Sequence, residues 1–303
     1  SKLYNLFIAT RIMEFVETTT EDSLILQGIL VEPSKKTETA IIHIHGMGGN
    51  FWENSFIQNM ISEYPKNNIA FLTVETRGAE LLRWFSTTDG NRRLIGDSYE
   101  LFEESIYDVD AWVNFLESKG YKNIHLQGHS LGCSKIVYYQ KMKNNSVIKS
   151  LLFISPSDMM GLLVEPKYKA EYEKFLKQAK ELVKNGKENE LLSDIHWSFA
   201  RQSAKSFINF SFENDNLAIF NYYNSERGFK TIQSIKTPML SILGTNDDGI
   251  VTDPYKSNEM LKKAAINSKK FHGVVLKEAK HDFVGFEKEI VSSVLEFMKR
   301  LPK

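Results

Sequence analysis

The sequence predicts an α/β fold in which a mostly parallel central sheet is flanked by helices and interrupted by a helical insertion. Strand-like and helix-like segments alternate through residues 11–155, which is the pattern of parallel sheets built from strand–helix–strand units. Residues 156–228 are helical in pattern and rich in lysine and aromatic residues, and the alternation resumes over residues 229–303. We therefore expect one core domain formed by residues 1–155 and 229–303, with residues 156–228 inserted as a helical cap or lid.

The expected strands share short runs of apolar and β-branched residues, bounded by turn-forming residues. They lie at residues 11–19, 23–32, 40–45, 69–75, 123–127, 150–155, 238–243 and 271–276. The expected core helices share apolar residues at three- and four-residue spacing. They lie at residues 51–64, 98–119, 130–142, 254–265 and 284–301, and residues 78–97 are expected to form a polar loop.

Within the insertion, aromatic residues are expected mainly to form its own core, with some of them lining a pocket. They include Tyr172, Phe175, Trp197, Phe199 and Phe207.

Composition excludes several function classes. Hydrophobic residues make up 42% and charged residues 25% of the 303 residues, and Lys+Arg and Asp+Glu both number 38. A net charge of zero gives no overall attraction to nucleic acid or to an anionic membrane, so neither partner is expected. No apolar run is long enough to span a bilayer.

The cysteine count bears on the compartment. The single cysteine, Cys133, can form neither an intramolecular disulfide nor a cysteine metal cage. It favours a reducing, cytoplasmic location, and the residues after Ser1 do not have the pattern of a signal peptide. The chain begins at Ser1 rather than Met, which is compatible with trimming.

The most informative motif is Gly128-His129-Ser130-Leu131-Gly132, which matches G-x-S-x-G. It lies directly after an expected strand and directly before an expected helix, which is the context that this motif requires. A strand that enters a helix with almost no loop forces the serine into a strained backbone conformation and exposes its hydroxyl. The flanking glycines leave room for the turn. We therefore predict that Ser130 is a nucleophile; the alternative is a structural turn in which Ser130 only caps the helix.

In this motif and its order along the chain, the sequence resembles the α/β-hydrolase family. His45-Gly46-Met47-Gly48-Gly49 follows the expected strand at residues 40–45, where that family places its oxyanion loop. The resemblance implies that the backbone N–H groups of Met47 and Leu131 bind the oxyanion of a tetrahedral intermediate. A tight glycine-rich turn without a role in anion binding is the alternative.

The resemblance also implies a catalytic base. His281 lies between the last expected strand and the closing helix, where the family carries its catalytic histidine. His129 is too close to Ser130 in sequence to reach its hydroxyl. His43 and His45 are two residues apart and so share one face of the expected strand, which could suggest a metal site. No third ligand follows at a recognisable spacing, so no metal site and no cofactor are expected.

The catalytic acid is open between three residues. Gly244-Thr245-Asn246-Asp247-Asp248 follows the expected strand at residues 238–243 and resembles the family's acid loop, in which the carboxylate comes three residues after the glycine. This favours Asp247. Asp248 is the choice if the loop is shifted by one residue, and Asp158 is the choice if the acid follows the preceding strand.

Together these residues predict a serine hydrolase that cleaves an acyl bond, most simply in a small or medium apolar carboxylic ester, with Ser130, His281 and Asp247 as the triad. Three alternatives stay open: a thioesterase, an acyltransferase that uses the same residues, and a ligand-binding or receptor protein that has lost turnover.

Overall fold

The computed structural model describes residues 12–196 and 200–301. Strands of the main sheet are β1 (Ile12–Thr19), β2 (Ile25–Glu32), β3 (Thr39–Ile44), β4 (Ala70–Val74), β7 (Asn123–His129), β8 (Ile148–Ile154), β9 (Met239–Gly244) and β10 (Phe271–Leu276). Their order in space is β1-β2-β4-β3-β7-β8-β9-β10. In the described part of this sheet, the β1–β2 and β2–β4 pairings are antiparallel. From β4 to β10 all neighbours are parallel, so the predicted mostly parallel sheet is confirmed.

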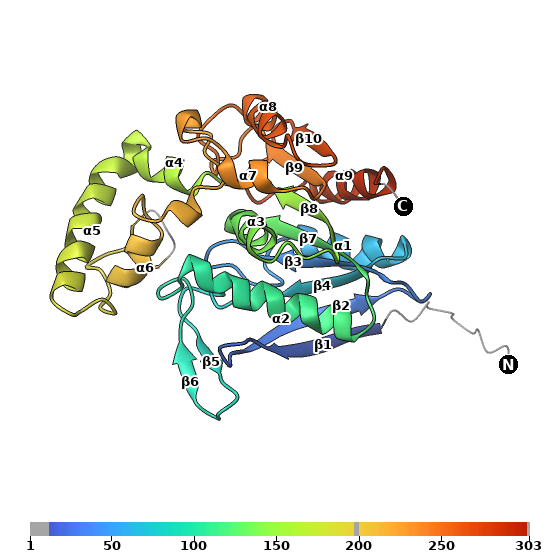
Figure 1. Ribbon diagram of the computed structural model, residues 1–303, viewed down its shortest axis with the longest axis horizontal. Coiled ribbons are helices and arrows are strands. Elements are labelled where there is room, and N and C mark those ends of the chain that lie inside the picture. The colour runs from blue at the N-terminus through green and yellow to red at the C-terminus, as the bar shows by residue number, and fades with distance from the viewer. Residues whose placement is uncertain (1–11, 197–199, 302–303) are drawn as a thin grey trace.

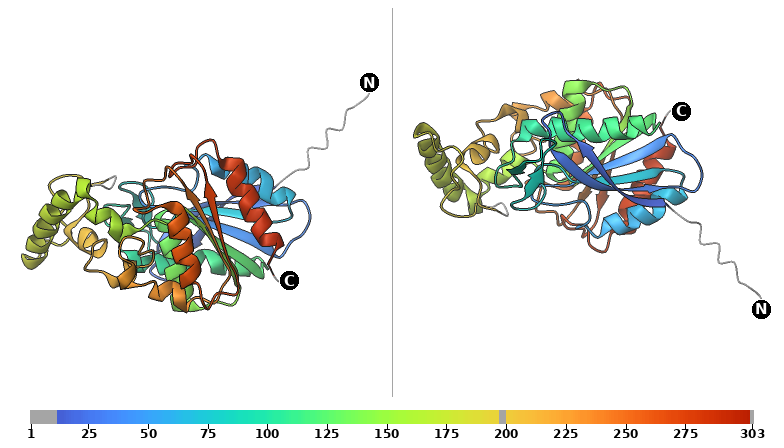
Figure 2. Two further views of the ribbon diagram at one scale, coloured as in Figure 1. Left: turned by 90° about the horizontal axis from the view of Figure 1, so that it is seen from above. Right: turned by 90° about the horizontal axis from the view of Figure 1, so that it is seen from below.

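Helices cover both faces of this sheet (Figures 1 and 2). The core helices are α1 (Phe56–Lys66), α2 (Ser105–Ser118), α3 (Leu131–Lys143), α7 (Lys230–Ser234), α8 (Pro254–Ala264) and α9 (Glu287–Lys299). One apolar core holds Trp112 of α2 and Ile136 of α3, and the other holds Met60 of α1 and Val294 of α9. The central strands are buried from both sides, as expected of parallel strands.

Between β8 and β9 the chain forms the helices α4 (Met159–Val164), α5 (Pro166–Lys184) and α6 (Ala204–Asn209), followed by the short 3₁₀ helices η2 (Asp215–Leu217) and η3 (Ser225–Arg227). Helices α4 to α6 extend away from the sheet (Figure 1). Tyr172, Phe175 and Phe207 are buried together in a small core of this segment. Trp197 and Phe199 lie outside the described residues. That this segment acts as a cap stays a prediction.

Three expected boundaries were wrong. The polar loop at residues 78–97 contains a hairpin of β5 (Trp84–Ser86) and β6 (Arg92–Leu94). Its turn holds Asp89-Gly90, with Gly90 at φ 82°, and an Asp-Gly pair is a recognisable hairpin signal. The helix expected at 51–64 begins only at Phe56.

The helix expected at 98–119 begins at Ser105, after the 3₁₀ helix η1 (Phe102–Glu104). Glu100 turns inward instead, where its carboxylate meets the Lys135 ammonium at 2.5 Å in the interior. Among the described residues, no helix is both long enough and apolar enough to cross a membrane.

Candidate active site

Ser130 lies at the sharp turn between β7 and α3. Its backbone angles are φ 54° and ψ −125°, a region that a residue with a side chain adopts only under strain. A Cβ on Gly128 would lie 2.5 Å from the Cys133 nitrogen, and one on Gly132 would lie 2.2 Å from the Ile44 oxygen. The turn therefore needs both glycines, and the strained conformation predicted for Ser130 is present.

His281 lies in the loop between β10 and α9, where contacts of its side chain and of its backbone hold it. Its Nδ1 is 2.7 Å from Asp247 Oδ1, and its backbone carbonyl is 2.8 Å from His129 Nε2. Burial is the largest cause acting on His129 and lowers its pKa to about 4, so the ring is neutral near pH 7. His129 can then donate its Nε2–H to that carbonyl, which fixes the His281 loop to the serine turn.

Of the three acidic candidates, Asp247 is the one in contact with the imidazole. It follows β9, and its carboxylate accepts bonds from the Ser155 hydroxyl at 2.5 Å and the Gly249 N–H at 2.8 Å besides His281. Asp248 is exposed. Asp158 instead caps α4 through the Gly161 N–H and accepts the Tyr223 N–H at 2.7 Å.

The two charges of the pair stabilise each other. Burial acts to raise the pKa of Asp247, but the hydrogen bond and positive charge of His281 outweigh it and lower that pKa below its usual value. Burial acts to lower the pKa of His281, and Asp247 outweighs it and raises that pKa above 6.5. The arrangement thus combines an ionised carboxylate with an imidazole of increased basicity.

The glycine-rich loop after β3 lies against the serine. A Cβ on Gly46 would be 2.9 Å from Ser130 Cβ and 3.5 Å from its Oγ. The Met47 N–H has no acceptor among the described residues, and Leu131 is the first residue of α3, where a helix leaves its N–H groups unpaired. Both amides are therefore free to bind an anion.

His45 holds this loop in place. Its Nε2 is 3.0 Å from the Thr76 N–H, and its Nδ1 is 2.7 Å from the Gly46 carbonyl oxygen. Burial is the largest cause acting on its pKa, which falls to about 3. His43 is also buried and lies 2.8 Å from the Gln127 amide through its Nδ1. Both histidines are therefore buried and hydrogen-bonded to neighbouring groups of the protein, which is a structural role.

Sequence reasoning missed two serines that follow β8. Ser157 Oγ lies 3.2 Å from Ser130 Oγ, and among the hydrogen bonds of the described residues none joins Ser130 to His281. A Cβ on Gly249 would be 2.3 Å from His281 Cε1 and 2.9 Å from Ser157 Oγ, so the imidazole and the Ser157 hydroxyl face the same small space. The only sequence signal for Ser155 and Ser157 was their position after a strand of the parallel sheet.

A metal ion has one possible set of ligands at the site. Within the described ranges, Asp247, Asp248 and His281 are the group whose ligand atoms lie within 4.8 Å of one another. The His281 nitrogen on this side, Nδ1, is already bound by Asp247 and Ser155. A metal would have to displace these contacts, so the arrangement fits an acid–base pair better.

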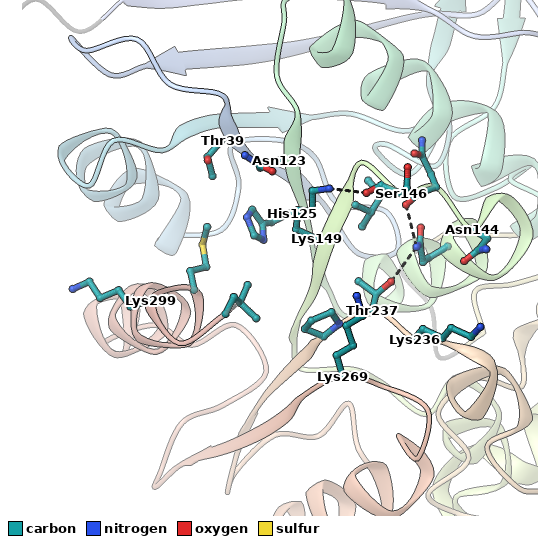
Figure 3. Close-up of a pocket in the computed structure, with 16 residues that line it drawn as sticks. Thr39, Asn123, His125, Asn144, Ser146, Lys149, Lys236, Thr237, Lys269 and Lys299 are labelled. Atoms are coloured by element: carbon teal, nitrogen blue, oxygen red, sulfur yellow. Dashed lines mark hydrogen bonds between the residues drawn. The ribbon is translucent and has the colours of Figure 1, made fainter. Parts of the chain in front are cut away.

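A separate cavity of about 1060 Å³ lies at the other end of the sheet (Figure 3). It is lined near the amino ends of the strands by Thr39, Asn123, Ile148 and Pro238, and four lysines are among its lining residues. Ser130, Ser155 and Asp247 instead follow the carboxyl ends of their strands. This cavity is therefore no part of the candidate site.

Residues 101–299 match the family described as "Protein of unknown function (DUF1749)". This chain belongs to the DUF1749 family. The match includes Ser130, Asp247 and His281, whereas the loop that carries Met47 precedes it. No curated protein matches this DUF1749 chain.

Solved structures similar to this DUF1749 protein include an esterase, an α/β hydrolase and a siderophore hydrolase. The esterase Pf2001 of Pyrococcus furiosus has a TM-score of 0.64 at 19% identity, covering 96% of this chain and 92% of that one. The α/β hydrolase GrgF of Penicillium sp. sh18 has a TM-score of 0.68 at 16% identity, covering 96% and 99%. The siderophore hydrolase EstB of Aspergillus fumigatus has a TM-score of 0.66 at 13% identity, covering 95% and 98%. The DUF1749 chain therefore has the α/β-hydrolase fold that its motifs indicated.

Proposed function

We propose that this DUF1749 protein is a serine hydrolase that cleaves an acyl bond, most simply that of a carboxylic ester. The observation that carries the proposal is the His281–Asp247 pair, held beside the turn on which Ser130 takes a strained conformation. A serine hydroxyl is a weak nucleophile until a neighbouring base takes its proton. The names of the structural neighbours, an esterase and two hydrolases, agree with this chemistry.

In the proposed reaction, Ser130 Oγ attacks the carbonyl carbon while His281 Nε2 takes the hydroxyl proton. The negative charge that develops on the carbonyl oxygen is bound by the N–H groups of Met47 and Leu131, each worth roughly 3–4 kcal/mol of transition-state stabilisation. The protonated imidazole, stabilised by Asp247, then gives its proton to the departing alkoxide. Water, activated by the same imidazole, hydrolyses the acyl-enzyme and restores Ser130.

Before the attack, the Ser130 hydroxyl has to leave Ser157 and turn towards His281. Catalytic hydrogen bonds are often long or poorly aligned before substrate binds and become shorter in the complex. We further infer that residues 156–228 form a cap over the site, since this segment leaves the core directly after Ser155, at the carboxyl end of β8, and its Ser157 contacts Ser130.

The experiment uses short p-nitrophenyl esters together with a fluorophosphonate probe. Wild-type protein should hydrolyse the esters, and mass spectrometry should find the probe on Ser130. The Ser130→Ala variant should show neither turnover nor labelling. A correctly folded wild-type protein that neither turns over esters nor reacts with the probe would falsify the proposal.

The resting contact of Ser130 with Ser157 favours one second candidate, a ligand-binding protein of the same fold that turns over slowly or not at all. Tight binding of an apolar ester or acid without turnover would favour it. A thioesterase or acyltransferase would use the same residues as an esterase. Acyl-thioester substrates and product analysis with a competing alcohol separate these activities from ester hydrolysis.

A further inference from the structure

Ser155 lies where the chain leaves β8 for the site. Its N–H donates to the Ile242 carbonyl at 2.9 Å and so extends the pairing of β8 with β9. Its φ is 50°, a value that costs a residue with a side chain on the order of 1–3 kcal/mol. The residue is fully buried. The backbone of Ser155 is therefore held by the sheet rather than carried on a loop of its own.

The hydroxyl of Ser155 contacts both members of the acid–base pair. Its Oγ is 2.5 Å from Asp247 Oδ2 and 2.8 Å from His281 Nδ1, while Asp247 Oδ1 is 2.7 Å from the same Nδ1. The three side chains thus form a closed ring of contacts. Ser150 and Ser157 are the neighbouring serines. Among the hydrogen bonds of the described residues, none joins either of them to Asp247 or His281.

The number of hydrogens available determines which atom donates and which accepts in each of these three contacts. An ionised carboxylate only accepts, and a serine hydroxyl has one hydrogen. That hydrogen goes to Asp247, which leaves a lone pair of Ser155 Oγ facing His281 Nδ1. Nδ1 must then carry a hydrogen, because two lone pairs at 2.8 Å repel each other. The neutral imidazole is thereby held with its hydrogen on Nδ1 and its lone pair on Nε2.

We infer that Ser155 is a positioning residue that, together with Asp247, locks His281 in the tautomer whose Nε2 can act as a base. This assignment rests on the proposed function for its role in turnover, but the tautomer itself can be observed without any substrate. If Ser155 were absent, Nδ1 would keep one acceptor instead of two, and the ring plane would be held by one contact.

The test compares Ser155→Ala with Ser150→Ala as a matched control. Ser150 lies on β8, the strand that Ser155 follows, and is also fully buried. Its hydroxyl also contacts a histidine Nδ1, that of His125 at 2.7 Å. His125 lies on β7 towards the opposite end of the sheet. The control therefore reproduces the loss of a buried serine–histidine contact on β8 without touching the site.

Two readouts are needed. The first is the ¹⁵N chemical shifts of the His281 imidazole above its pKa, assigned among the seven histidines by comparison with His281→Gln. Wild type and Ser150→Ala should have the shifts of a ring with hydrogen on Nδ1. Ser155→Ala should show a measurable fraction of the other tautomer, because Asp247 then holds the imidazole alone and the ring can turn away from the carboxylate. The second is ester hydrolysis, in which Ser155→Ala should lower kcat about tenfold to a hundredfold with KM unchanged.

Three results would overturn the inference: an unchanged tautomer in Ser155→Ala, a kcat within twofold of wild type, or an equal loss in Ser150→Ala. If Ser155→Ala fails to fold, Ser155→Gly replaces it, since glycine accepts the positive φ, and the same outcomes apply. The inference and the proposed function fail separately. Mixed tautomers in a variant of a protein without esterase activity would support the positioning role and contradict the ester reaction.

Discussion

Replacing Asp247 by asparagine changes one oxygen to an NH₂ group and removes one charge at almost constant volume. The carboxylate accepts three hydrogen bonds, from His281 and Gly249 on Oδ1 and from Ser155 on Oδ2. An amide offers only one oxygen. If the NH₂ group takes the position of Oδ1, its hydrogens face the Gly249 N–H and the His281 Nδ1–H. If it takes the position of Oδ2, its hydrogens face the Ser155 hydroxyl, whose own hydrogen must then turn towards His281 Nδ1. The first arrangement favours the tautomer with hydrogen on Nε2, which cannot act as a base towards Ser130, and the second sets the serine hydrogen against the Nδ1–H and weakens the hold on the catalytic tautomer.

The expected loss in kcat is roughly 10⁴-fold, the size of the effect when the corresponding carboxylate of a serine protease becomes an amide. This corresponds to about 5.5 kcal/mol of transition-state stabilisation. The pH dependence should also change. In wild type, Asp247 raises the pKa of His281 above 6.5, so activity is lost as the pH falls through that raised value. Without the charge, burial dominates and lowers the His281 pKa, and the residual activity should persist to lower pH.

The assay is the pH dependence of kcat/KM for a p-nitrophenyl ester, with thermal unfolding to check that the variant is folded. Asp248→Asn is the matched control, because Asp248 is the exposed neighbour that the sequence left open as the acid. It should retain activity within about twofold, since surface changes away from special contacts have small effects. An Asp247→Asn variant within tenfold of wild type, or one whose acidic limb does not move, would refute the assignment of the acid.

Further changes test the turn, the packing and the interior. Ser130→Ala should lower kcat by on the order of 10⁶-fold without lowering Tm, and a residual rate near wild type in the ester assay would contradict its role. Gly132→Ala should cost about 1–3 kcal/mol of stability in urea unfolding, because the new Cβ would lie 2.2 Å from the Ile44 oxygen; an unchanged midpoint would count against the tight turn. Lys135→Met should cost about 3–5 kcal/mol at neutral pH by leaving Glu100 buried and unpaired. Burial raises the pKa of Glu100, so this cost should decrease as the pH falls, and a pH-independent cost would disprove the explanation.

The sequence was most informative where local chemistry forces the local structure. No residue with a side chain fits at the two glycines around Ser130 in so sharp a strand-to-helix turn. The absence of a loop between strand and helix predicted a strained serine, and its φ is 54°. Apolar runs at residues 123–127 and 271–276 marked β7 and β10 closely. These signals depend only on neighbours along the chain, which is why they could be interpreted without the fold.

The sequence was less informative where residues distant in the chain meet. Lysine is usually found at the surface, yet Lys135 is buried against Glu100, a residue that the sequence had placed in a helix. The β5–β6 hairpin had an Asp-Gly signal. Its apolar residues do not alternate in the sequence, because Trp84 faces solvent although it is as apolar as its buried neighbour Phe85.

What the sequence determined by itself is the α/β alternation, the position of the serine turn and the loops that carry His281 and the acidic residues, because each follows from short-range patterns of polarity and glycine. Only the tertiary structure decided which carboxylate meets the imidazole. Asp158, Asp247 and Asp248 all follow strands of one parallel sheet, and a shift of a single residue reverses the side to which a side chain points. The hydroxyl of Ser155 joined the pair for the same reason, since adjacent parallel strands bring their carboxyl ends to one edge of the sheet.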